Sequence, residues 1–217
     1  IPFKVRLLDK YSNPVPLADI TFESVSGGGS FKGENVTTVS TDSSGDAQAL
    51  FTLGTIAGEG VYMAQVFTMV NGNTVPATPL QFHASATAGP ASLADVISGN
   101  NQQGTVNTQL QNPFILQITD AFGNPVNDYD LTFGVMHGGG TINGSSSLET
   151  KTNQNGNAKA NLILGEKAGQ NIVRIDLPEL EPNFIQFTAT GLVDNPFAVV
   201  YVSGDNQSGP KNKQLPE

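Results

Sequence analysis

The chain has 217 residues, a length that suits two domains of about 100 residues each. Only 13% of the residues are charged, whereas soluble domains typically carry about 25%, and the formal net charge is −9. This negative balance disfavours binding to nucleic acids and to anionic membranes. The absence of cysteine excludes disulfides, thiolate zinc sites and cysteine nucleophiles. No apolar run reaches the ~18 residues of a membrane span, so no membrane insertion is expected.

Alternation of apolar and polar residues starts at once and predicts β-strands. Phe3, Val5 and Leu7 share one face of the first expected strand, while Lys4 and Arg6 share the other. Many short strands separated by turn residues are typical of a β-sandwich. In the first half of the chain, further strands are predicted over residues 20–25, 36–41, 47–53, 61–70 and 80–86.

The second half of the chain repeats the first. The stretch FILQITDAFGNPV at 114–126 matches FKVRLLDKYSNPV at 3–15, an offset of 111 residues, and the glycine triplet at 27–29 recurs at 138–140. A repeat of this length is a domain, because solenoid units span about 20–50 residues. The sequence therefore predicts an all-β chain of two tandem β-sandwiches. They are domain 1 over residues 1–89 and domain 2 over residues 90–193.

The offset between the two copies falls to 105 residues toward the end of each domain, since Gln81-Phe82 matches Gln186-Phe187. Domain 1 thus holds six residues that domain 2 lacks, and we expect them at a hairpin tip near Asn71-Gly72-Asn73. The linker is expected over residues 87–91, and its shortness favours restricted motion between the domains.

The phase of the repeat determines where each domain opens. Residues 93–98 are expected to be the first strand of domain 2, and their counterpart near the end of the chain is FAVVYVS at 197–203. Domain 1 is therefore expected to lack its own first strand, and residues 194–217 to be the opening strand and linker of a next repeat. The alternative is cropping, in which the chain is part of a tandem array whose remainder is absent.

An open sheet edge invites strand addition. We hypothesise that the segment 197–203 completes domain 1 of a next unit, within a covalent array or between subunits of a fibre. The acceptor groove is the apolar face of the strand expected at the start of the chain, formed by Phe3, Val5 and Leu7. The donor interface is the apolar run Phe197, Val199, Val200, Tyr201 and Val202.

Four spaced motifs form a family pattern. They are D-x-x-G-N-P-V at 120–126, S-G-G-G at 26–29, T-D-x-x-G-x-A at 41–47 and L-G-x-x-A-G at 53–58. Together they resemble bacterial Ig-like domains of group 1, the invasin and intimin type of surface module. The resemblance implies an Ig-like β-sandwich on the bacterial surface, used as a stalk or adhesive repeat, with no shared catalytic residues. Ser12, where the family has glycine, and His137, before the second glycine triplet, depart from the pattern.

Residues that carry catalysis are sparse in this chain. His83 and His137 do not recur between the copies, and histidine needs partners to act as a base or ligand. The glycine triplets lack the Lys-Ser/Thr pair and the helix of a phosphate-binding loop, so a bend or bulge is their expected role. Neither a G-x-S-x-G elbow nor an opposed pair of carboxylates is indicated. The sequence predicts a protein that is not an enzyme and requires no cofactor.

A calcium site is one candidate exception. Asp120, Asp128 and Asp130 lie close together in the sequence, and Ca²⁺ takes six to eight oxygen ligands. No EF-hand or calcium-repeat spacing accompanies them. Solvated turn carboxylates are the alternative interpretation.

Three functions remain open. The first is a structural repeat of a bacterial cell-surface stalk, fibre or adhesin, joined end to end to further copies or adjacent Ig-like repeats. The second is a domain that binds a host or cell-surface ligand, which would need a loop cluster rich in aromatic residues or arginine. The third is a spacer beside the catalytic domain of a secreted enzyme.

Overall fold

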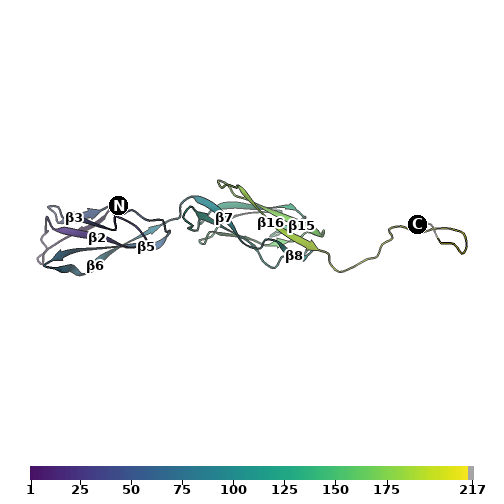
Figure 1. Cartoon of the computed structure of the whole chain (residues 1–217), viewed down its shortest axis with the longest axis horizontal. Coiled ribbons are helices and arrows are strands. Elements are labelled where there is room, and N and C mark those ends of the chain that lie inside the picture. The colour runs from purple at the N-terminus through teal and green to yellow at the C-terminus, as the bar shows by residue number, and fades with distance from the viewer. Residues whose placement is uncertain (215–217) are drawn as a thin grey trace.

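The computed structural model describes residues 1–214, which form two β-sandwiches that lie end to end (Figure 1). Within these residues no helix is long and apolar enough to span a membrane. The strands of domain 1 are β1 (Phe3–Arg6), β2 (Asp19–Ser26), β3 (Val36–Ser40), β4 (Asp46–Ala49), β5 (Gly58–Val70) and β6 (Asn73–Ala86). The strands of domain 2 are β7 (Ala91–Ser98), β8 (Gln102–Thr105), β9 (Phe114–Asp120), β10 (Asp130–His137), β11 (Thr141–Ile142), β12 (Ser147–Lys151), β13 (Asn157–Ala160), β14 (Leu162–Ile163), β15 (Gly169–Asp176) and β16 (Phe184–Leu192).

Domain 2 is a sandwich of two main sheets. One sheet has the strand order β12-β10-β15-β16-β8, and the other has the order β13-β9-β7. A small sheet of β11 and β14 adds to them. Side chains along β9 alternate between fully and partly buried, because successive residues of a strand point to opposite faces. The predicted all-β Ig-like sandwich is confirmed.

Domain 1 has the same layout without the flanking strands. Its sheets have the orders β3-β2-β5-β6 and β1-β4. Among residues 1–214, therefore, no strand flanks β1 as β7 flanks β9, and none flanks β6 as β8 flanks β16. This arrangement of residues 1–89 is the one that the phase of the repeat predicts, and the division of the chain into repeats stays a prediction. The second unflanked edge, along β6, was not foreseen, since residues 102–105 were not predicted to form a strand.

The missing strands leave the core of domain 1 partly open. The three core side chains of β9 are at most 1% exposed, whereas their counterparts Phe3, Val5 and Leu7 are only partly buried. The Phe3 ring lies 4.6 Å from Phe82 and 5.1 Å from Phe51 between centroids, so aromatic contacts fill part of the gap. Because burial contributes about 25 cal/mol per Å² of apolar surface, we expect domain 1 to be the more weakly stabilised of the two.

The glycine triplets are close-packed bends. A Cβ on Gly54 would lie 2.7 Å from the carbonyl oxygen of Gly28, and one on Gly165 would lie 1.8 Å from that of Gly138. The loop after β4 or β14 therefore rests directly on the backbone of a triplet. Gly138 also has a φ of 90°, which glycine adopts more readily than other residues. The triplets are bends, as predicted, and the close packing of the following loop on them is an additional role that the sequence did not indicate.

The six additional residues of domain 1 are divided between two places. The pairing of β5 with β6 and of β15 with β16 aligns Gly58 with Gly169 at an offset of 111. Tyr62 pairs with Ala84, and Asn171 pairs with Ala189, which is the equivalent of Ala84 at the offset of 105. Tyr62 is therefore equivalent to Asn171, at an offset of 109 residues. Two residues are thus inserted in an irregular stretch at the start of β5. The remaining four lie toward the β5–β6 tip, where all six were predicted.

One strand is shorter than predicted. Residues 47–53 alternate, but β4 ends at Ala49, and only an isolated bridge from Thr52 to Ser30 follows. In domain 2 the matching stretch is divided into β13 and β14. The chain leaves one sheet at this point to reach the glycine triplet, so the alternation continues across a break in pairing.

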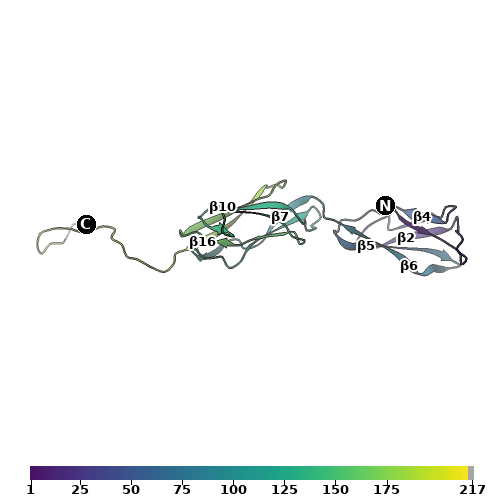
Figure 2. The ribbon, with the colours of Figure 1, turned by 180° about the vertical axis from the view of Figure 1, so that it is seen from behind.

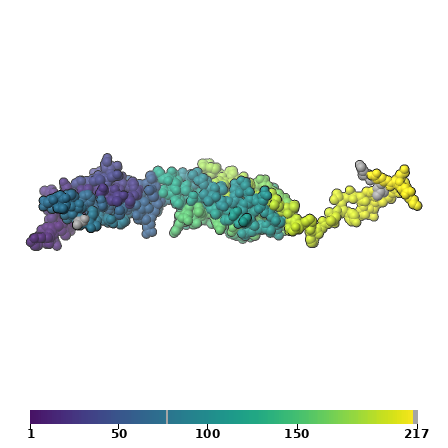
Figure 3. Space-filling model, turned by 60° about the horizontal axis from the view of Figure 1, so that its bottom comes forward, coloured from purple at the N-terminus to yellow at the C-terminus, as the bar shows by residue number. Residues whose placement is uncertain are grey.

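The segment after β16 leaves the domains altogether. Residues 193–214 contain no strand and extend beyond domain 2, away from domain 1 (Figures 1 and 2). In the space-filling view they form a narrow extension of a rod (Figure 3). Phe197, Val199 and Val202 are almost completely exposed. This segment does not fold back onto domain 1 of its own chain, and its predicted pairing with another unit stays a prediction.

Candidate functional site: the joint between the domains

The joint consists of a short linker and two loops. The linker spans residues 87–90, between the end of β6 and the start of β7. From domain 2 comes the loop 120–126, which carries the D-x-x-G-N-P-V motif. From domain 1 comes the loop 53–57, which connects β4 to β5 and rests on the first glycine triplet.

Asp120 organises the loop of domain 2. Its side chain is 4% exposed, and each carboxylate oxygen accepts two N–H groups. Oδ1 accepts from the backbone N–H groups of Phe122 and Asn124, both at 2.9 Å. Oδ2 accepts from the Asn124 side-chain amide and from the backbone N–H of Gly89 in the linker, also at 2.9 Å. One carboxylate therefore ties the loop to the linker.

Asn124 connects the two domains directly. Its Nδ2 donates to the backbone oxygen of Thr55 at 2.7 Å, and its Oδ1 accepts from the backbone N–H of Ala57 at 2.9 Å. A side-chain amide carries one donor group and one acceptor on a planar fork, so it matches a backbone C=O and N–H presented side by side. Because Nδ2 also donates to Asp120, the amide is held in position for this two-point contact.

The loop of domain 1 is fixed from the inside by Tyr62. This side chain is fully buried, and its hydroxyl donates to the backbone oxygen of Ile56 at 2.8 Å. The same hydroxyl accepts from the Ile56 backbone N–H at 3.1 Å. Tyr62 thus satisfies the inward-facing backbone groups of the loop. The groups on Thr55 and Ala57 remain to be satisfied by Asn124.

A hollow of about 470 Å³ lies at the joint. Domain 1 lines it with residues 57–58 and 86–88, and domain 2 with residues 125–127 and Gln154. Domain 1 contributes only alanine, glycine and threonine to its walls, and domain 2 contributes larger side chains such as Val126 and Gln154. The joint is therefore suited to setting the direction of one domain relative to the next.

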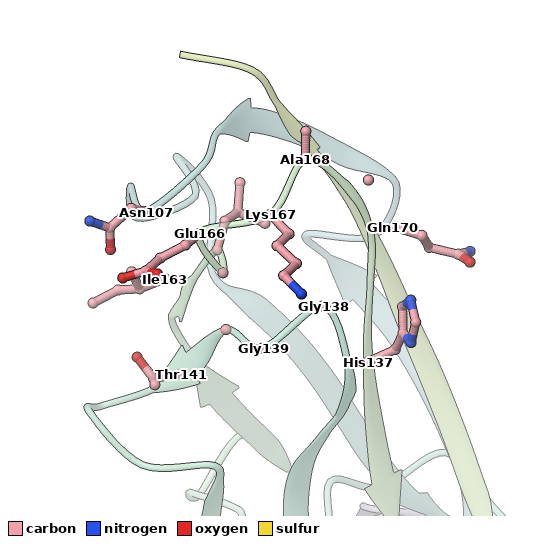
Figure 4. A pocket seen from close by; sticks show the side chains of 14 residues that line it. Asn107, His137, Gly138, Gly139, Thr141, Ile163, Glu166, Lys167, Ala168 and Gln170 are labelled. Atoms are coloured by element: carbon pink, nitrogen blue, oxygen red, sulfur yellow. The ribbon is translucent and has the colours of Figure 1, made fainter. Parts of the chain in front are cut away.

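A second hollow, of about 680 Å³, lies at the far end of domain 2. In Figure 4 the loop with Glu166, Lys167 and Ala168 lies across the hollow from Gly138 and Gly139, and the Lys167 side chain is directed toward the glycine triplet. His137 lies at its rim (Figure 4). The elements that form this end correspond to those that domain 1 presents to the joint.

The three candidate calcium ligands do not converge. Both oxygens of Asp120 are occupied by N–H donors, and Asp130 forms a salt bridge with Lys151 at 3.1 Å. Asp128 accepts a hydrogen bond from Asn127 at 2.8 Å. Within residues 1–214 no group of three or more potential metal ligands is brought together. Calcium binding has no assembled site here and stays an untested expectation.

The predicted donor and acceptor residues do not meet within the chain. The run Phe197–Val202 extends beyond domain 2 (Figure 1), whereas Phe3, Val5 and Leu7 pack, partly buried, against the core of domain 1. The role of Asn124 was not predicted from the sequence. The signal was present, because the spacing of Asp120 and Asn124 recurs as Asp9 and Asn13, but it was interpreted only as a turn.

The fold and the joint define a tandem of two Ig-like β-sandwich domains. No protein-family model and no curated protein matches the sequence. Among solved structures, Yersinia pseudotuberculosis InvD is 17% identical with a TM-score of 0.55, and the match covers 95% of this chain and 54% of InvD.

Two further adhesin structures are similar. The Escherichia coli adhesin FdeC is 18% identical, with a TM-score of 0.43 and coverage of 84% of this chain and 57% of FdeC. The Yersinia pseudotuberculosis adhesin InvE is 18% identical, with a TM-score of 0.38 and coverage of 87% and 53%. The chain spans about half the length of these three structures. At these identities the likeness concerns the fold.

Acid is expected to weaken domain 2 through Asp120. Burial raises the pKa of this carboxyl, but the hydrogen bonds from Asn124, Gly89 and Phe122 outweigh it and lower the pKa to about 2 from 3.8. Because the folded-state pKa is lowered, the stabilisation is present above about pH 4 and is lost as the pH falls toward 2. Asp120→Asn is expected to lower the free energy of unfolding of domain 2 by about 1–3 kcal/mol at neutral pH.

Calorimetry from neutral pH down to about pH 2 tests this expectation, because the difference between variant and parent should shrink on acidification. The unfolding transition of domain 1 in the same molecules is the internal control. A difference that stays constant with pH would show that the charge of Asp120 is not what stabilises the loop.

Proposed function

We propose that this chain is a structural repeat of a bacterial cell-surface stalk, fibre or adhesin, in which domains join end to end. The observation that carries the proposal is the joint. A short linker, a buried carboxylate and a two-point amide contact hold two sandwiches in line. In domain 2 the chain arrives at the joint and leaves at the opposite end, so it advances along the long axis of the molecule (Figure 1). An extracellular location and a non-catalytic role without a cofactor are parts of this proposal.

The open edge of domain 1 is where a further strand would pair. In domain 2, β7 pairs with β9 so that Ala94 faces Ile118 and Val96 faces Leu116. Transferred by the repeat offsets, this register places Val199 opposite Leu7 and Tyr201 opposite Val5 of a neighbouring unit. Whether the neighbour is covalent or a second subunit is left open by this register.

The register also assigns roles within the donor run. Ala94 packs against the core of domain 2, while Leu93, Val96 and Ile97 are 40–53% exposed. By analogy, Val199 would face inward and its neighbours in the run would stay largely on the outer face. Main-chain hydrogen bonds would then contribute more to pairing than apolar burial.

Ultracentrifugation and small-angle scattering test the proposal. The full chain is compared, over a range of concentrations, with a chain that ends at Val193. Strand donation between subunits predicts end-to-end oligomers of the full chain alone, whereas a covalent array predicts rod-shaped monomers of both. A compact particle with the domains folded against each other would overturn the stalk. Saturable binding of coated beads to host cells would support the ligand-binding alternative instead.

A further inference from the structure

The free end of domain 1 carries a copy of the loop that docks in the joint. Asp9 Oδ1 accepts from the backbone N–H groups of Tyr11 and Asn13, at 2.8 and 2.9 Å. Asp9 Oδ2 accepts from Asn13 Nδ2 at 3.0 Å. These are the same three bonds that Asp120 makes within its own loop. The Asn13 amide is thus held in the docking orientation although no domain packs on it, so this arrangement is a property of the loop itself.

The free end of domain 2 carries a copy of the surface that receives the loop. Glu166, Lys167 and Ala168 correspond to Thr55, Ile56 and Ala57 at the offset of 111. Ala168 is exposed, and its backbone N–H has no hydrogen-bond partner within residues 1–214.

This second loop is supported from within by Asn171. Asn171 is 1% exposed and stands where domain 1 has Tyr62. Its Oδ1 accepts from the Gly165 backbone N–H at 3.4 Å. The loop borders the hollow shown in Figure 4. Different side chains therefore support the same loop in the two domains, and the outward-facing backbone groups are available at this end.

We propose that the Asn13 loop of one copy of this chain docks on the Glu166–Ala168 loop of another, in the way that Asn124 docks on Thr55 and Ala57. Asn13 Nδ2 donates to the backbone oxygen of Glu166, and Asn13 Oδ1 accepts from the backbone N–H of Ala168. The occupant of the end of domain 2 is domain 1 of a second copy. This inference rests on the proposed end-to-end function. It supplies a contact between copies that has the same form as the joint within the chain.

The match extends to the linker. Asp120 Oδ2 accepts from the Gly89 backbone N–H, and Gly89 corresponds to Asp194 at the offset of 105. The backbone N–H of Asp194 would therefore reach Asp9 Oδ2 in the second copy. Such a contact joins two different surfaces, and heterologous contacts of this kind generate open filaments when the rotation between units does not close a ring.

Charged side chains distinguish the new contact from the internal joint. Lys10 stands where the internal loop has Ala121, and Glu166 and Lys167 replace Thr55 and Ile56. Across the contact, Lys10 can pair with Glu166 but is repelled by Lys167. The attraction and the repulsion nearly cancel, so these charges do not select the partner. The specificity is therefore assigned to the asparagine amide.

A tandem polypeptide of two copies tests the inference. Glu217 of the first copy is joined to Pro2 of the second, because Pro2 aligns with Pro113 in the repeat. Amide hydrogen exchange is followed by NMR. The Ala168 N–H of the first copy is expected to exchange at least about tenfold more slowly than in the single chain. The Ala168 N–H of the second copy has no following domain and should remain fast.

Two matched variants identify the contact. Asn13→Ala in the second copy should restore fast exchange at Ala168 of the first copy and leave Ala57 protected. Asn124→Ala in the first copy should give fast exchange at Ala57 of that copy and leave Ala168 of that copy protected. Fast exchange at Ala168 in the parent tandem, within an extended particle by scattering, would overturn this inference and leave the stalk standing. A compact tandem would overturn both.

Discussion

Replacing Phe114 by alanine is expected to lower the free energy of unfolding of domain 2 by about 3–5 kcal/mol, the usual cost of removing a buried phenylalanine. The Phe114 ring is 1% exposed and stacks on Phe187 with 4.6 Å between centroids. The matched change Phe3→Ala is expected to cost domain 1 roughly half of that or less. Phe3 stacks on Phe82 at the same distance, but it is only partly buried because no strand covers its side of the sheet.

Calorimetry of the two variants measures this difference, since each substitution should shift only the transition of its own domain. For a domain of this size, 3–5 kcal/mol corresponds to a shift in Tm of well over 10 °C. In the tandem polypeptide, Phe3→Ala in the second copy should become about as costly as Phe114→Ala, because the segment 197–203 can then pair beside β1. Equal losses in the single chain would show that the open edge does not weaken domain 1.

Replacing Asn124 by alanine is expected to release the joint without unfolding either domain. The variant loses two hydrogen bonds between the domains, and each contributes about 1 kcal/mol. The docked arrangement should therefore become ~30-fold less favoured relative to free orientations of the domains. Residual dipolar couplings and small-angle scattering measure the result as a loss of a common alignment and a broader distribution of lengths.

Asn13→Ala is the matched control for this experiment. Asn13 makes the same bond to its own aspartate but contacts no other domain in the single chain. Asn13→Ala therefore removes the same asparagine–aspartate bond within a loop but leaves the hydrogen bonds between the domains in place. Identical behaviour of the two variants would mean that the linker alone aligns the domains.

Much of the fold could be predicted from periodicity and repetition. Alternation placed the strands from β1 to β7 to within a few residues in most cases, since a strand with one buried face alternates by necessity. The open edge of domain 1 also followed from the phase of the repeat. The short strand β8 escaped prediction because residues 102–105, QQGT, carry no apolar alternation. They pair in parallel with β16 mainly through the backbone.

The contact between the domains could not be predicted from the sequence, for a different reason. Asp120 and Asn124 have the composition of an ordinary turn, and their bonds within the loop are those of a turn. Only the position of Thr55 and Ala57 opposite them turns the amide into a connector. Similarly, Tyr62 and Asn171 share a role that the sequence conceals, because two inserted residues shift their alignment.

The sequence by itself determined that this protein consists of two β-sandwich copies in tandem, because strand periodicity and a domain-length repeat are properties of residue order alone. Only the tertiary structure decided which loops meet, which carboxylate is buried and that the edge along β6 also stays open. Those features depend on backbone groups that meet side chains from positions about 70 residues away, as the Thr55 carbonyl meets the Asn124 amide. A backbone N–H or C=O is the same for every residue type except proline, so no pattern of side chains announces its partner.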